Sequence, residues 1–263
     1  MTGSIPEQFR PSGKHWNQYV LGGGALEQTE NSLRFVTVDA SSERLAEAQI
    51  DDYHTLARRH FLWQPPLTLT VRARFSHGEG MLRGTAGFGF WNDPFMMTGK
   101  RWPTLPRALW FFYASQPSNM KLDVDVAGHG WKAATIDALR LPFFLLAPLA
   151  PVAVPLMNVR PLYHALWPAG QRAIGVREAP VKTDMTDWHT YSLEWRVRTA
   201  RFCVDGTLVL ESDRSPRGPL GCVIWLDNQY MVVTPWGRFR YGRLDAPGKQ
   251  WMDVDRLTIE RRA

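Results

Sequence analysis

The sequence predicts an all-β fold, a sandwich of two curved antiparallel sheets. Short segments in which apolar and polar residues alternate dominate the chain, and this period of two is typical of strands with one buried face. Helical periodicity is expected only at 42–50 and 162–167, and both segments are too short to organise a domain. Many strands with few helices favour a sandwich or a barrel. Because no internal repeat or low-complexity linker interrupts the chain, we expect one domain over residues 1–263.

Alternation is clearest at 67–75, where apolar residues occupy every odd position, and the pattern recurs at 189–197. Asp205 and Gly206 then separate two apolar runs, and glycine tolerates the positive φ that a tight hairpin turn needs. These segments predict an antiparallel meander. Further strands are expected at 85–91, 108–115, 222–230 and 252–260.

Composition restricts the partners of this chain. The formal net charge is +6, but no run of basic residues exceeds two, so nucleic-acid binding is not indicated. The N-terminus lacks a basic region followed by an apolar one, which predicts a cytoplasmic protein. Cys203 and Cys222 are expected to be free thiols, and the histidines show no metal-ligand spacing. We therefore expect no cofactor and no metal, although a calcium site built from loop oxygens leaves little trace in a sequence.

Residues 141–159 carry no charge, a length that borders on a membrane span. Four prolines argue against a lone helix in lipid, because each removes a backbone donor. The sequence predicts instead a proline-rich apolar loop, a lid-like insertion at about 139–170. Such a segment is suited to cover the core, to roof a cavity for an apolar ligand, to contact a membrane surface, or to join two subunits. The oligomeric state is not predicted.

Two segments carry a family resemblance: "DWHTYSLEWRVRTARFCVDGTLV" at 187–209 and "MDVDRLTIE" at 252–260. They resemble strands of glycoside hydrolase family 16, in the concanavalin A-like lectin/glucanase superfamily, which implies a jelly-roll sandwich. That family carries its catalytic strand, Glu-x-Asp-x-Glu, upstream of the first of these segments. If the strand order holds, the stretch "KLDVDV" at 121–126 occupies the same place.

This resemblance gives roles to three residues of "KLDVDV". Lys121 replaces the nucleophile, Asp123 keeps the central carboxylate, and Asp125 stands for the acid/base. Lysine cannot form the glycosyl ester that a retaining glycosidase needs, so the motif does not favour hydrolysis. Three interpretations follow: a polar strand face, a binding groove without catalysis, or an acid/base pair for non-hydrolytic chemistry. His129, between two glycines, is a weaker catalytic candidate.

Aromatic residues beside polar ones indicate a ligand cleft, because ring faces stack on sugars while amides and carboxylates bind hydroxyls. The candidate ligand-binding residues are Trp91, Asn92, Trp110, Phe112, Trp131, Trp225, Asp227 and Asn228. The sequence thus predicts an intracellular cleft protein that binds a carbohydrate-like or glycosylated small molecule. The alternative is a non-hydrolytic isomerase, cyclase or lyase that acts on an apolar molecule under the 141–159 segment. A third possibility is a protein that uses this segment to contact a membrane surface.

Overall fold

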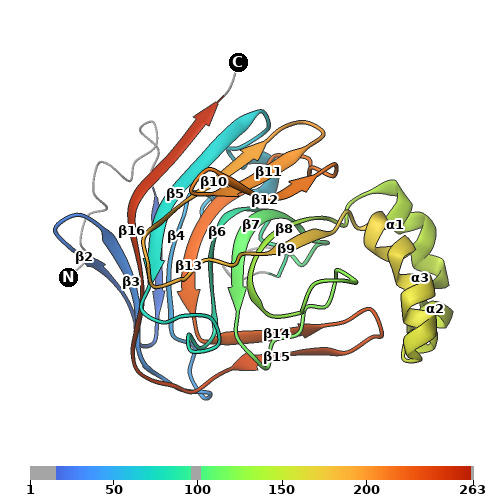
Figure 1. Ribbon diagram of the computed structural model, residues 1–263, viewed down its shortest axis with the longest axis horizontal. Coiled ribbons are helices and arrows are strands. Elements are labelled where there is room, and N and C mark those ends of the chain that lie inside the picture. The colour runs from blue at the N-terminus through green and yellow to red at the C-terminus, as the bar shows by residue number, and fades with distance from the viewer. Residues whose placement is uncertain (1–15, 96–101, 262–263) are drawn as a thin grey trace.

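The computed structural model describes residues 16–95 and 102–261 of the chain. Within these residues the strands form two seven-stranded antiparallel sheets and one separate two-stranded hairpin (Figure 1). The predicted antiparallel sandwich is confirmed.

One sheet, here called the cavity sheet, holds the candidate site on the face that points away from the second sheet. Its strands, in spatial order, are β1 (Asn17–Leu21), β4 (Glu47–Asp51), β13 (Gly221–Asp227), β6 (Thr85–Trp91), β7 (Arg107–Ala114), β8 (Gly130–Asp137) and β9 (Arg177–Pro180).

The second sheet, here called the outer sheet, packs against the cavity sheet. Its strands, in spatial order, are β12 (Thr207–Ser212), β11 (Ala200–Val204), β10 (His189–Trp195), β5 (Leu67–Phe75), β16 (Ala246–Arg261), β3 (Leu33–Ala40) and β2 (Gly24–Gln28). The separate hairpin consists of β14 (Gln229–Val233) and β15 (Phe239–Arg243), and a short 3-10 helix, η3, spans Arg58–His60. In the turn between β11 and β12, Asp205 and Gly206 both have positive φ, as the hairpin prediction required.

The core lies between the two sheets and is rich in aromatic rings. Phe88 and Phe111 of the cavity sheet contact Tyr191 of the outer sheet at ring distances of 5.1 Å each. Phe111 also meets Phe202 edge-on at 5.4 Å. Because side chains alternate along a strand, burying Phe111 directs Trp110 and Phe112 to the opposite face of the cavity sheet. The core therefore determines which residues line the candidate site.

Between β8 and β9 the chain forms helices instead of the proline-rich loop predicted for 141–159. These are α1 (Leu141–Leu146), a 3-10 turn η4 (Ala147–Leu149), α2 (Ala150–Leu156) and α3 (Arg160–Ala173). We call residues 141–173 the helical insertion. Each of these helices begins with proline in its first turn, where the missing N–H costs no hydrogen bond. The helix expected at 162–167 is confirmed within α3.

The helix expected at 42–50 is wrong, because β4 occupies its second half. A turn joins Ser41 to Arg44, and β4 then pairs with β1 on one side and with β13 on the other. Two ladders of backbone hydrogen bonds outweigh the weak helical preference of nine residues. The strand expected at 222–230 also differs, since it ends at Asp227 and β14 begins after Asn228.

Candidate functional site

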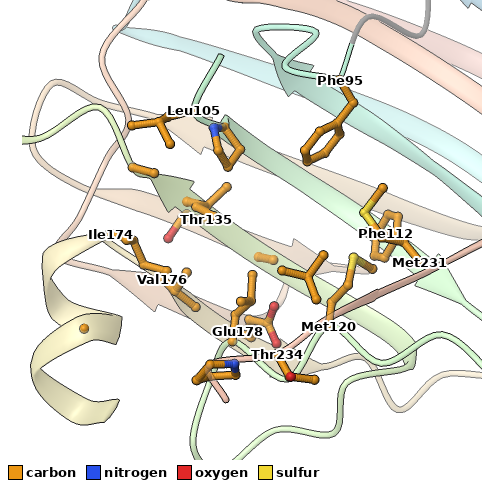
Figure 2. Close-up of a pocket in the computed structure, with 18 of the residues that line it drawn as sticks. Phe95, Leu105, Phe112, Met120, Thr135, Ile174, Val176, Glu178, Met231 and Thr234 are labelled. Atoms are coloured by element: carbon orange, nitrogen blue, oxygen red, sulfur yellow. The ribbon is translucent and has the colours of Figure 1, made fainter. Parts of the chain in front are cut away.

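A cavity of about 600 Å³ lies between the cavity sheet, the helical insertion and the β14–β15 hairpin. Figure 2 shows Phe112 and Met231 on one side of this space, with Ile174 and Val176, just after α3, on the other. Most of its lining is aromatic or aliphatic. The insertion contributes inward-facing residues such as Phe143, which makes the helices one wall of the cavity. Such an apolar concave space with few polar groups is typical of a small-molecule site.

Four aromatic residues on three neighbouring strands form the floor of the cavity. The ring of Trp110 lies 5.8 Å from Trp91, 5.7 Å from Trp225 and 5.3 Å from Phe112, the last in a stacked arrangement. Gly87 makes room for this layer, because a Cβ atom there would lie 2.8 Å from Cη2 of Trp225. The missing side chain lets the indole lie across the sheet.

Two carboxyl groups stand at one end of this floor. Glu47 of β4 and Asp227 of β13 are direct cross-strand partners, and both are buried. Residues paired in this way have Cβ atoms about 4.5–5.5 Å apart. The Asp227 carboxylate accepts hydrogen bonds from the hydroxyl of Thr85 at 2.8 Å and from the backbone and side-chain amides of Gln229 at 2.8 and 2.9 Å. The Oε2 atom of Glu47 has no hydrogen-bond partner among the described residues.

Because their hydrogen bonds differ, the two carboxyl groups differ in pKa. Burial raises the pKa of Asp227 to about 6, and its hydrogen bonds limit the rise. Burial raises the pKa of Glu47 well above its usual value, and the charge of Asp227 adds to the effect. Glu47 therefore holds its proton to a higher pH than an ordinary glutamate, and Asp227, whose carboxylate accepts several hydrogen bonds, is the member of the pair better suited to carry the negative charge. A protonated carboxyl group in an apolar cavity is suited to donate a hydrogen bond or a proton.

The hydrogen bonds around Asp227 extend to the aromatic floor. The indole N–H of Trp225 donates to the hydroxyl of Thr85 at 2.9 Å, and that hydroxyl donates to Asp227. The chain of bonds fixes the orientation of the Trp225 ring beside the carboxyl pair.

A second polar pair lines the cavity from β8 and β9, across the sheet from Glu47. The Lys132 ammonium group donates to Glu178 at 2.8 Å and to the carbonyl of Ala127 at 3.1 Å, and both side chains are buried. Burial raises the pKa of Glu178, and the charge of Lys132 opposes the rise. The cavity thus has polar groups at two ends and apolar walls between them.

Five of the eight predicted ligand-binding residues line the cavity: Trp91, Trp110, Phe112, Trp225 and Asp227. The other three serve the fold. Trp131 packs in the core 5.4 Å from Phe75. Asn92 accepts a hydrogen bond from the backbone of Arg107, and Asn228 donates to three backbone carbonyls.

The strand expected at 121–126 is wrong, because these residues form a loop between β7 and β8. Asp123 accepts a hydrogen bond from the backbone N–H of Asp125 at 2.9 Å, which is a turn rather than a strand. The Lys121 ammonium group folds back onto the carbonyls of Val124 and Val126, at 2.7 Å each. The comparison with a catalytic strand therefore fails.

None of the four predicted catalytic residues lines this cavity, but Asp123 and Asp125 line a second, more open pocket beside Arg177 and Glu211. Asp123 accepts a hydrogen bond from Gln171 of α3 at 2.7 Å and so ties the loop to the helical insertion. Asp125 is exposed, and the half-buried His129 ring lies 3.4 Å from the amide of Gln116. Burial lowers the pKa of Lys121, but its contacts serve the loop.

Sequence reasoning missed Glu47, Gln49, Lys132 and Glu178, all of which line the cavity. A signal for the first two was present: Glu47, Gln49 and Asp51 alternate with Ala48 and Ile50, which is the period of a strand. Among the described residues, no group of three or more His, Cys, Asp or Glu side chains is placed to hold a metal ion. Cys203 and Cys222 are both free thiols, the second of them buried.

No protein-family model and no curated protein sequence matches this chain. Solved structures do. A β-1,3-1,4-glucanase (lichenase) from a mouse hindgut metagenome is similar at 12% identity and a TM-score of 0.52, over 97% of each chain. A Bacillus licheniformis β-glucanase is similar at 10% identity and a TM-score of 0.51, over 100% of each chain. At these identities the likeness concerns the fold, which is the concanavalin A-like β-sandwich expected from the family-16 resemblance.

Proposed function

We propose that the cavity binds a largely apolar small molecule and that Glu47 transfers a proton to it in a non-hydrolytic reaction, of the isomerase, cyclase or lyase type. One observation carries this proposal. The carboxyl group of Glu47 is buried at the end of an apolar cavity, has a pKa that burial raises well above its usual value, and offers an Oε2 atom that no described residue engages. Such a group is an acid that lies next to the space where its substrate would bind.

The walls favour an apolar ligand. Between Glu47 at one end and the Lys132–Glu178 pair at the other, the ligand would meet aromatic rings of the floor and aliphatic side chains of the helical insertion. Hydroxyl groups buried against these walls would lack partners, and each would cost about 1–3 kcal/mol. An elongated hydrocarbon with one polar or unsaturated end avoids that cost.

The residues support proton transfer without another reactant. Glu47 donates its proton to a double bond, and the resulting cation lies against the faces of Trp225 and Trp110, whose π-systems attract positive charge. A neighbouring carbon then returns a proton to the Glu47 carboxylate, which restores the acid and gives an isomer of the substrate. Asp227 keeps Glu47 protonated between turnovers, because its negative charge opposes a second one nearby.

Carbohydrate binding is the second candidate, and one observation favours it. Trp110 and Phe112 stack at an interplanar angle of 24°, and Glu47, Gln49 and Gln229 lie around the same cavity. A ring platform beside amide and carboxyl groups suits a pyranose.

Binding and turnover can be tested together with a panel of acyclic isoprenoids and a panel of oligosaccharides. Tryptophan fluorescence reports binding, and mass spectrometry after reaction in D₂O reports proton exchange. We expect isoprenoids to bind, and Glu47→Gln to preserve that binding while it abolishes deuterium incorporation. Glu260→Gln, at an exposed position of the outer sheet, is the matched control. Deuterium incorporation by Glu47→Gln at the wild-type rate would refute the acid role, and a response to oligosaccharides alone would favour the second candidate.

A further inference from the structure

The helical insertion exposes large apolar side chains on the side that faces away from the cavity. Leu145 is 67% exposed, Val152 68% and Phe144 51%. None of the three lines the cavity, whereas Phe143 and Leu146, their neighbours in sequence, do. The two short helices are therefore apolar on both faces. A surface helix of a globular domain normally carries polar residues on its outer face. The apolar outer face of α1 and α2 therefore indicates an interaction site.

Positive charges predominate around this face. No acidic residue occurs at 138–177 or at 228–244, which contain the helical insertion and the β14–β15 hairpin. The loop that Gln171 ties to α3 adds the buried Asp123 and the exposed Asp125. Arg140 precedes α1 and Arg160 begins α3. The tip of the β14–β15 hairpin reaches the insertion (Figure 1), where the side-chain amide of Asn158 donates to the carbonyl of Trp236 at 3.3 Å. That contact brings the exposed Arg238 to the same end.

Two more arginines border the ends of the insertion. Arg217 donates to the carbonyl of Leu139, just before α1, at 2.7 Å. Arg214 donates to the carbonyl of Arg172 in the last turn of α3, also at 2.7 Å. Arg217 and Arg214 also lie 3.9 and 3.7 Å from the carboxylates of Asp137 and Asp213. The apolar patch is thus bordered by arginines, of which Arg140, Arg160 and Arg238 lie in segments without acidic residues.

We infer that the outer face of α1 and α2 docks on the surface of an anionic lipid bilayer. Apolar side chains enter the boundary between headgroups and acyl chains, and the surrounding arginines bind the negatively charged headgroups. No helix among the described residues is long and apolar enough to cross a membrane, so these helices lie in the interface. Because the same helices form a wall of the cavity, an apolar ligand would enter directly from the bilayer; this last step rests on the proposed function.

Vesicle co-sedimentation of the full chain tests the docking. One set of vesicles contains phosphatidylcholine alone, and in the other about a third of the lipid is phosphatidylserine. We expect the wild type to prefer the second set. Leu145→Glu/Val152→Glu should weaken binding to both sets by about 10-fold or more, because it removes apolar anchors. Arg160→Gln/Arg238→Gln should weaken binding to the phosphatidylserine vesicles by about 10-fold and remove the preference.

Val197→Glu is the matched control, since Val197 is 67% exposed in the turn between β10 and β11. Absence of wild-type binding to either vesicle set would overturn the inference, and so would an equal loss from Val197→Glu. A solution dimer that Leu145→Glu/Val152→Glu dissociates, without vesicle binding, would assign the face to a second copy of the chain. Glu47→Gln should sediment like the wild type, which separates failure of the docking from failure of the proposed chemistry. Thermal unfolding of each variant verifies that it is folded, and the arginine pair tests the docking if the leucine–valine pair does not fold.

Discussion

Replacing Asp227 with asparagine removes a buried carboxyl group whose pKa is raised from 3.8 to about 6. Between these two values the unfolded chain has lost this proton while the folded protein still holds it. The free energy of unfolding is therefore highest below pH 3.8, where both states hold the proton, and it falls as the pH rises through about 6. A difference of about 2 pH units, at 1.36 kcal/mol per unit, corresponds to about 3 kcal/mol of unfolding free energy.

Asparagine at this position stays neutral at every pH, so the variant should lack this decline. Its amide oxygen can accept the hydrogen bond from the Thr85 hydroxyl, and the amide of Gln229 can rotate to accept one from the new NH₂ group. The loss of the negative charge also favours ionisation of Glu47, which further flattens the pH dependence in the variant. The wild type should thus lose about 2.4 kcal/mol relative to Asp227→Asn between pH 4 and pH 7, because at pH 4 the unfolded aspartate is already more than half ionised.

Urea unfolding followed by tryptophan fluorescence at several pH values between 4 and 7 measures this difference. Asp213→Asn is the control, because the side chain of Asp213 is 66% exposed. Its stability should follow the wild-type curve. Parallel curves for the wild type and Asp227→Asn would refute the reasoning, since they would mean that Asp227 titrates alike in the folded and unfolded states.

Three further outcomes are expected. Gly87→Ala should lower the melting temperature and cost about 1–3 kcal/mol, because the new Cβ would lie 2.3 Å from the carbonyl oxygen of Phe111 and 2.8 Å from Trp225; an unchanged melting temperature would contradict the close packing around Gly87. Trp110→Ala should weaken isoprenoid binding by about 10-fold, as measured by titration calorimetry, because it removes the central ring of the floor; equal affinity would exclude Trp110 from the site. Lys132→Met should cost about 3–5 kcal/mol in urea unfolding by leaving Glu178 buried and unpaired, and Lys132→Met/Glu178→Leu should recover most of it.

The strands that the sequence predicted most directly are those with one face in solvent. In β5 every second residue is buried, and the alternation appears directly in the sequence. All residues of β8 are buried, because the core covers one face and the cavity site the other. Such a strand lacks the alternation of a half-exposed one, and β8 was not predicted. Burial on both faces is not the whole reason, because β6 and β13 are also buried throughout and were predicted. β4 is also buried throughout, yet its polar residues alternate with Ala48 and Ile50, so the helix expected at 42–50 overlooked a strand pattern that the sequence contains.

The sequence predicted the aromatic residues of the site but not most of its charged residues. Clusters of tryptophan and phenylalanine indicated a ligand surface, and Trp110, Phe112 and Trp225 do line the cavity. The sequence pattern predicted the carboxyl groups at 121–126, where aspartates alternate with apolar residues as in a strand. There the Asp123 side chain forms a turn with the backbone of Asp125, a local contact that the pattern of polarity does not distinguish from a strand.

The helical insertion has a property that the roofing of a cavity does not explain. Without the insertion, the aromatic floor would be an apolar patch open to water, and any helix with one apolar face would be enough to cover it. The chain uses instead a segment without a single charged residue from 141 to 159, which covers the floor and exposes Leu145 and Val152 in its place. The insertion therefore covers one apolar surface, the floor, and exposes another on its own outer face. A partner that is itself apolar, with negative charges where the chain carries arginines, accounts for both features, and a bilayer of anionic lipids has that composition.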